Sequence, residues 1–222
     1  MKNITKLVAL GTIVAASTPF ALATPVTPGG PVITATNAIT VTDDGVVASI
    51  SGGLSAATYT GNYAEYVIKD GTNPYGVDDL TFLITVSNNT GSPNGIEHVS
   101  DGSINGFSMF PSVNVGYLAG PGDMGSDAPL TIDETIYGTV EFNFTGTDNI
   151  AAGTGTQYLV IQTAATNYTT GNIGVIDSST DTVDGFVPAA ATPEPSSLAL
   201  LGTGLMGATT LLRRRRNAGN VA

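Results

Sequence analysis

The sequence predicts an all-β fold, an antiparallel β-sandwich of the immunoglobulin-like or jelly-roll type, with an N-terminal signal peptide before it and a single hydrophobic helix after it. Two segments, residues 80–87 and 139–145, alternate apolar and polar side chains with the period of two that is typical of a half-buried strand. Threonine favours strands and is frequent between residues 24 and 192, where glycine and asparagine supply turns. Many short strands separated by turns indicate a sandwich.

The expected strands follow one another at short intervals and number about nine to eleven. In chain order they include residues 32–41, 46–50, 63–69, 80–87, 113–117, 139–145, 158–161, 173–176 and 183–187. Residues 158–161 are continuously apolar, which indicates a strand covered on both faces. Asp44-Gly45 predicts a hairpin between the first two strands, and Pro93-Asn94-Gly95 predicts another turn. We find no internal repeat, so residues 24–191 are expected to form one secreted domain.

Residues 1–23 have the three parts of a secretory signal peptide. Lys2 and Lys6 form a short positive region, and an apolar stretch of about ten residues follows it. Ala21 and Ala23 are the small residues that a signal peptidase requires. Because the apolar stretch is too short to span a membrane, we expect cleavage after Ala23 and export of the chain.

The distribution of charge excludes one class of partner. The chain has 7 Lys and Arg and 18 Asp and Glu in its 222 residues. All but one of its acidic residues lie between residues 24 and 192, where Lys69 is the only base. Such a surface repels phosphates, so we expect no nucleic-acid partner. The absence of cysteine excludes disulfides, thiolate zinc sites and a cysteine nucleophile.

The C-terminal segment combines three features in order: Pro193-Glu194-Pro195, the apolar residues 196–212, and the cluster Arg213, Arg214, Arg215 and Arg216. As a helix, the apolar run would be about 26 Å long, which is marginal for a hydrocarbon core of about 30 Å. Arginines can snorkel to the headgroups and favour the cytoplasmic side. The two prolines keep the tripeptide extended, a form that suits a protease.

This arrangement resembles the C-terminal sorting signal of PEP-CTERM proteins, and the resemblance covers about residues 192–216 together with the signal peptide. In that family, which is found in exopolysaccharide-forming bacteria, a membrane-bound transpeptidase called exosortase processes the protein at or near the signal. The resemblance implies that Pro193, Glu194 and Pro195 are the recognition peptide. It implies little about residues 24–191, because the middle regions of the family vary widely.

No catalytic group stands out in the middle of the chain. His98 is the only histidine, and the G-x-S-x-G motif of one class of serine hydrolase is absent. We expect His98 on a strand or at its edge in a structural role. A glycosidase needs two facing carboxylates, but nothing selects a pair among Glu65, Glu97, Glu134 and Glu141. The chain is therefore predicted not to be an enzyme.

Two binding functions stay open as alternatives. The oxygen-rich loop of residues 70–79, and a second loop with Asp123 and Asp127, could hold a structural calcium ion, although neither loop matches an EF-hand. No metal ligand set and no required cofactor are predicted. Four nearby tyrosines could form a platform for sugar rings, although core packing is the favoured role and the chain has no tryptophan. These tyrosines are Tyr59, Tyr63, Tyr66 and Tyr75.

The sequence thus predicts an exported, non-enzymatic cell-surface or exopolysaccharide-matrix protein of a bacterium. Its precursor would be held in the inner membrane by residues 196–212. Its processing partners would be signal peptidase and an exosortase-like membrane protease, and exopolysaccharide is a further candidate partner. The main alternative is a calcium-dependent adhesin or polysaccharide-binding β-sandwich module. A secreted hydrolase is the third possibility, and it would require convergent carboxylates in a cleft.

Overall fold

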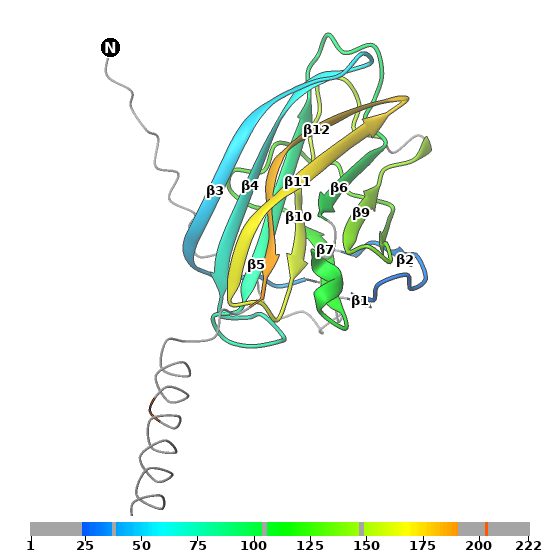
Figure 1. Cartoon of the computed structure of the whole chain (residues 1–222). Helices are drawn as coiled ribbons and strands as arrows, with labels where there is room; N and C mark the ends of the chain where they lie inside the picture. The colour runs from blue at the N-terminus through cyan, green and yellow to red at the C-terminus, as the bar shows by residue number, and fades with distance from the viewer. Residues whose placement is uncertain (1–23, 37–38, 104–105, 147–148, 191–202, 204–222) are drawn as a thin grey trace, which may run out of the picture. The chain divides into compact units, whose positions relative to one another are not determined.

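The computed structural model describes residues 24–36, 39–103, 106–146, 149–190 and 203, and its strands form two six-stranded antiparallel sheets (Figure 1). Sheet A has the order β1 (Thr24–Val26), β7 (Val113–Leu118), β10 (Tyr158–Gln162), β5 (Leu80–Asn88), β4 (Thr60–Asp70) and β3 (Asp43–Ser55). Sheet B has the order β12 (Ser179–Ala189), β11 (Asn167–Asp177), β6 (His98–Gly102), β9 (Thr139–Asn143), β8 (Thr131–Glu134) and β2 (Ile33–Thr34). A short 3-10 turn, η1 (Phe107–Met109), lies between β6 and β7.

The main hydrophobic core lies between the two sheets, as expected for a sandwich-like fold. Phe82, Ile84 and Val86 point into it from β5, and Val140 and Phe142 point into it from β9. The apolar positions that alternate in the sequence are therefore the positions that the fold buries. The all-β prediction is confirmed, whereas the immunoglobulin-like or jelly-roll type stays a prediction.

The outer face of sheet A is also covered, which was not expected for the strand at residues 80–87. Residues 36 and 39–42 cross this face; we call them the crossing segment. Ile39 of this segment packs in a second apolar cluster with Leu83 and Val160. The Tyr117 amide donates to the Thr36 carbonyl at 3.2 Å. Thr81 and Thr85, expected on a half-exposed face, are completely buried. Thr81 bonds Asp70, which accepts from the Thr42 amide of the crossing segment, whereas Thr85 accepts from the Met124 amide of another loop.

The prediction for residues 32–41 was wrong in most of its length. Among the residues described there, only Ile33–Thr34 form a strand, and the chain then crosses sheet A instead of turning back along itself. Asp44-Gly45 does not form a hairpin turn either. It lies within β3 next to a register shift between Asp43 and Gly45, where Gly45 has a φ of 144°. A glycine at such an angle serves a β-bulge as well as a turn.

The other expected strands are confirmed, several with longer bounds. The strand at residues 158–161 is β10, and all of its side chains are buried, as its continuous apolar sequence predicted. Pro93 and Asn94 lie in a bend between β5 and β6. The predicted signal peptide lies outside the described residues, and so does the predicted hydrophobic helix apart from Thr203, which is helical. In the described part of the chain, no helix has the length and apolar character needed to cross a membrane.

The long strands β3 and β12 are edge strands of their respective sheets. β3 has two irregularities in its pairing with β4, between Asp43 and Gly45 and between Val46 and Ala48. Two side chains from sheet B bond its main chain: Asp181 accepts from the Ser55 amide at 2.6 Å, and the Tyr168 hydroxyl donates to the Val47 carbonyl at 3.3 Å. Several peptide groups at this edge are therefore covered or displaced from a regular ladder.

Replacing Gly61 with alanine is expected to destabilise the domain. A Cβ atom at Gly61 would lie 2.0 Å from the Ser87 carbonyl oxygen, so the paired main chain would have to shift. Overpacking of this kind costs about 1–3 kcal/mol or more, which urea denaturation would detect. Gly53→Ala is the matched control, because a Cβ there has its nearest neighbour at 3.9 Å. Equal midpoints for the two variants would contradict the prediction.

Candidate functional site

The residues predicted to carry the sorting function lie outside the described part of the chain. They are Ala21 and Ala23 at the cleavage site, Pro193, Glu194 and Pro195 of the tripeptide, and Arg213, Arg214, Arg215 and Arg216. The candidate residues of the β domain are described, and they show what chemistry this domain can support.

A pair of carboxyl groups lies in the core between the sheets. Glu65 of β4 and Asp101 of β6 are both completely buried. The amide of Phe186 in β12 donates to Oε2 of Glu65 at 2.8 Å. Among the described residues, Oε1 of Glu65 and both carboxyl oxygens of Asp101 have no hydrogen-bond partner. Glu65 therefore bonds β4 of sheet A to β12 of sheet B, while the other three carboxyl oxygens of the pair have no partner among the described residues.

Burial raises the pKa of both groups. The pKa of Glu65 rises from its ordinary 4.5 to about 8, although the Phe186 amide acts in the opposite direction. Burial also raises the pKa of Asp101 well above its ordinary value, and the nearby charge of Glu65 adds to this rise. Near neutral pH Glu65 is therefore protonated for the most part, and burial favours the neutral form of Asp101 as well. Two buried neutral acids can share a hydrogen bond, but they cannot meet a substrate outside the core.

The remaining glutamates do not form a catalytic pair. Glu134 of β8 is buried with both oxygens lacking a described partner, and burial raises its pKa to about 7. Glu97 lies half-buried before β6, where its carbonyl accepts from the Phe144 amide. Glu141 lies on the outer face of sheet B, and burial and then the charge of Asp133 raise its pKa. Sequence reasoning missed Asp101, although a period of two from Val99 would have placed it in the core.

His98 begins β6, as expected, and takes part in a chain of polar contacts across sheet B. Its Nδ1 lies 2.6 Å from Oδ1 of Asn143, and Nδ2 of Asn143 donates to Asp133 at 2.9 Å. Since the Asn143 oxygen can only accept, Nδ1 of His98 carries the proton in this arrangement. These contacts connect β6, β9 and β8, which supports a structural role for the histidine.

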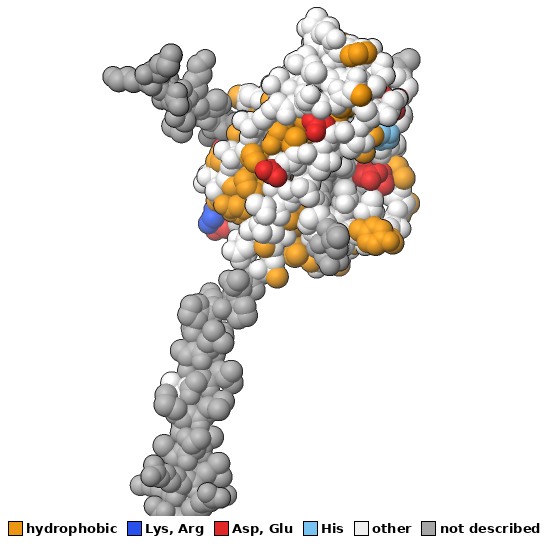
Figure 2. Space-filling model, turned by 45° about the horizontal axis from the view of Figure 1, so that its top comes forward, with side chains coloured by type: hydrophobic (Ala, Val, Ile, Leu, Met, Phe, Trp, Pro, Cys, Tyr) orange, Lys and Arg blue, Asp and Glu red, His pale blue; other side chains and the backbone are white. Residues whose placement is uncertain are grey.

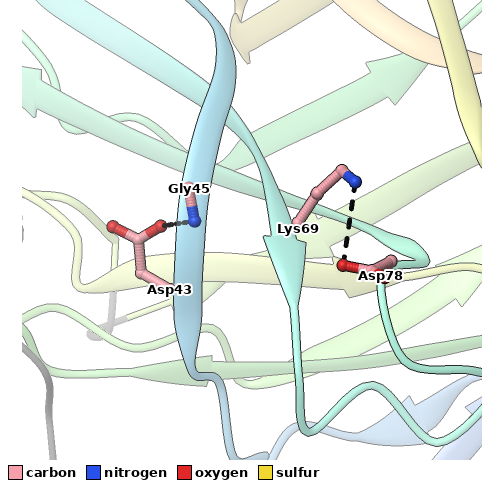
Figure 3. A network of polar contacts seen from close by, with 4 residues as sticks. All are labelled: Asp43, Gly45, Lys69 and Asp78. Atoms are coloured by element: carbon pink, nitrogen blue, oxygen red, sulfur yellow. Dashed lines mark hydrogen bonds and ion pairs between the residues drawn. The ribbon is translucent and has the colours of Figure 1, made fainter.

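In the loop of residues 70–79, the side chains best suited to bind a cation are buried and form hydrogen bonds within the domain. Asp70 is completely buried and accepts hydrogen bonds at both carboxylate oxygens. Asn73 is also buried and donates to the Thr163 carbonyl at 3.1 Å. Figure 3 shows the exposed side of this region, where Lys69 lies 3.7 Å from Asp78 and Asp43 accepts from the Gly45 amide at 2.9 Å.

The second acidic loop is likewise bonded to itself and to its neighbours. Asp123 accepts from the Gly120 amide at 3.1 Å, and Asp127 accepts from the Thr154 hydroxyl. Within the described residues, no group of three or more histidine and acidic side chains is placed to hold a metal ion. Figure 2 shows the acidic side chains of one face in separate spots and not in one patch.

The four tyrosines do not form a common platform. Tyr59 and Tyr63 are buried in the core between the sheets, and their hydroxyls donate to the carbonyls of Val175 and Asp184. Tyr66 packs on the opposite face of sheet A, edge-to-face with Tyr158 at 6.2 Å. Tyr75 is half-buried, with its hydroxyl 3.3 Å from that of Ser112. The favoured role in packing is confirmed for Tyr59 and Tyr63.

Comparison with known proteins identifies the C-terminal segment. The family model of the PEP-CTERM protein-sorting motif matches residues 191–216, which contain the predicted tripeptide and the arginine cluster. The chain is therefore an exported protein that a membrane exosortase sorts to the cell surface. It carries a PEP-CTERM sorting signal, as the sequence predicted. No curated protein and no solved structure matches the chain.

Proposed function

We propose that the chain is a non-enzymatic structural protein of the cell surface or exopolysaccharide matrix, and that it is a substrate of the sorting machinery. Signal peptidase removes residues 1–23. Residues 196–212 then hold the precursor in the inner membrane, and the arginine cluster keeps its C-terminus in the cytoplasm. An exosortase-type transpeptidase processes it near Pro193-Glu194-Pro195, and the β domain is released to its destination.

The match of the sorting motif to residues 191–216 is the observation that carries this proposal. The position of the last strand supports it, because β12 ends at Ala189, before the tripeptide. Cleavage at both places would leave every described strand of the two sheets intact.

The placement of the acidic residues supports a role without catalysis. Glu65 and Asp101 are enclosed in the core, while Glu97 and Glu141 lie on other surfaces. The adhesin alternative would need an exposed set of ligands, but Asp70 and Asn73 are bonded within the domain. The non-enzymatic role is therefore preferred over both the hydrolase and the calcium-dependent adhesin.

Replacing Glu194 with alanine is expected to stop C-terminal processing, because it removes the only charge in the recognition peptide. The readout is the intact mass of the protein purified from its own host. The wild type should lack residues 1–23 and the residues that follow the tripeptide, whereas Glu194→Ala should retain residues 196–222. Asp184→Ala is the control, since it removes an exposed acid on β12 outside the motif. Normal processing of Glu194→Ala, or a wild-type mass that includes residues 196–222, would overturn the proposal.

A further inference from the structure

A row of buried polar side chains crosses the outer face of sheet A beneath the crossing segment. Gln162 of β10 lies directly opposite Asn114 of β7 on one side and opposite Thr81 of β5 on the other. Asp70, at the end of β4, completes the row. Asp70 and Thr81 are completely buried, and Gln162 and Asn114 are 1% and 8% exposed. None of these residues has a role in the sorting function.

One oxygen of Asp70 contacts two reactive groups at once. Its Oδ2 accepts from the Thr81 hydroxyl at 2.9 Å and from Nε2 of Gln162 at 2.7 Å. Its Oδ1 accepts from the amides of Thr42 and Thr72, each at 2.9 Å, and these bonds fix the orientation of the carboxylate. The hydroxyl and the carboxamide are thus held side by side.

The orientation of the Gln162 carboxamide is defined by its partners. Nε2 donates to two groups that can only accept, Asp70 and the Thr40 carbonyl, the latter at 3.0 Å. Oε1 therefore points the other way and accepts from Nδ2 of Asn114 at 2.5 Å. A donor at this oxygen polarises the carbonyl and is placed to stabilise negative charge on it.

We propose that Thr81 and Gln162 form an intramolecular ester after the domain folds. The Thr81 hydroxyl is the nucleophile, Asp70 the base, the Gln162 carboxamide carbon the electrophile, and Asn114 the donor to the oxyanion. The same constellation of nucleophile, base and oxyanion donor serves acyl transfer in enzymes. Here it acts once, on the protein itself.

The reaction balances without any further reagent. Asp70 takes the proton of the Thr81 hydroxyl while Oγ1 forms a bond to Cδ of Gln162. The π electron pair of the Cδ–Oε1 double bond moves onto Oε1. When the carbonyl reforms, the bond from Cδ to Nε2 breaks, and Asp70 returns the proton to the nitrogen, which leaves as ammonia. The products are one ester and one ammonia molecule, with no oxidation or reduction.

Two features of the structure favour this reaction. Fixed neighbours react far faster than free molecules, since the entropy of bringing them together has already been lost on folding. Burial excludes the water that would otherwise hydrolyse the ester. The bond would join β5 to β10 in the middle of sheet A, and it would close a long loop in a chain that has no cysteine for disulfides.

Intact mass of the full-length chain, produced with its domain folded and then denatured, tests the ester. The wild type should be lighter than its sequence mass by one ammonia molecule. Fragmentation of a protease digest should find the peptides containing Thr81 and Gln162 joined, and hydroxylamine should separate them. This mapping also distinguishes the ester from a succinimide at Asn94-Gly95, which loses the same mass within one peptide.

Two threonine variants give a matched comparison. Thr81→Val keeps the shape of the side chain but removes the nucleophile, so its full sequence mass should return. Thr85→Val should still lose ammonia, because Thr85 is equally buried on the same strand but bonds the Thr156 carbonyl and not a carboxamide. A wild type at full sequence mass with separate peptides would overturn the proposal whether or not the variants fold. Joining of the same two peptides in Thr81→Val would overturn it as well.

Discussion

Raising the pH from 5 to 9 is expected to lower the stability of the β domain by several kcal/mol. The pKa of Glu65 is about 8 in the folded state, against an ordinary value of 4.5. Between these values the folded domain keeps a proton that the unfolded chain has released, so stability falls as the pH rises. Each pKa unit corresponds to about 1.4 kcal/mol, which gives roughly 5 kcal/mol for Glu65 as an upper estimate. The contribution is fully present below pH 4.5 and is lost as the pH passes 8.

Urea denaturation at several pH values measures this effect. Glu65→Gln should flatten the pH dependence and increase stability at pH 9, because a neutral carboxamide can still accept from the Phe186 amide and can donate to Asp101. The Asp101→Asn variant should act in the same direction, since its pKa is raised by burial and by Glu65. Glu97→Gln, at a half-buried glutamate outside the core, should retain the wild-type slope. A wild type that is equally stable or more stable at pH 9 would show that the pair is not buried as described.

Replacing Phe82 with alanine is expected to lower the free energy of unfolding by about 3–5 kcal/mol, which is a large fraction of the stability of an ordinary domain. Phe82 is completely buried at the centre of sheet A. Its ring packs edge-to-face against Phe107, with the ring centroids 5.5 Å apart and the planes at 82°. Truncation would leave a cavity between the sheets and remove this aromatic contact.

Tyr137→Ala is the matched control, since it removes an aromatic ring that is 65% exposed in the turn between β8 and β9. It should change stability by about 0.5 kcal/mol or less. Thermal and urea unfolding would compare the two variants with the wild type. A similar small change in both would mean that the region around Phe82 is not a packed core.

The strands were predictable from sequence wherever one face is polar and the other apolar. The alternation in residues 139–145 gave β9 correctly, because burial there depends only on which side of the strand a residue occupies. The same rule failed for Thr81 and Thr85, since segments distant in sequence cover their face. It also failed for residues 32–41, where Ile33–Thr34 join sheet B and Ile39 packs on sheet A without joining it.

The candidate sites divide in a similar way. A sorting signal is a continuous segment that other proteins recognise. Local sequence was therefore sufficient to predict Pro193-Glu194-Pro195 and the arginine cluster. The pairing of Glu65 with Asp101, and of Thr81 with Gln162, depends on contacts between strands that are far apart in sequence. No local pattern contains that information. Asp101 offered a partial signal through its spacing from Val99, but not the identity of its neighbour.

The irregular edge of β3 has a consequence for the proposed surface or matrix role, in which copies of the chain would be crowded. A regular edge strand is a template on which a strand of another molecule can add, and repetition of that step leads to fibres. In β3, two register shifts break the even spacing of peptide groups. In addition, Asp181 bonds the Ser55 amide and Tyr168 bonds the Val47 carbonyl. Crowded copies can therefore remain separate molecules, and any assembly among them must come from contacts other than sheet extension along β3.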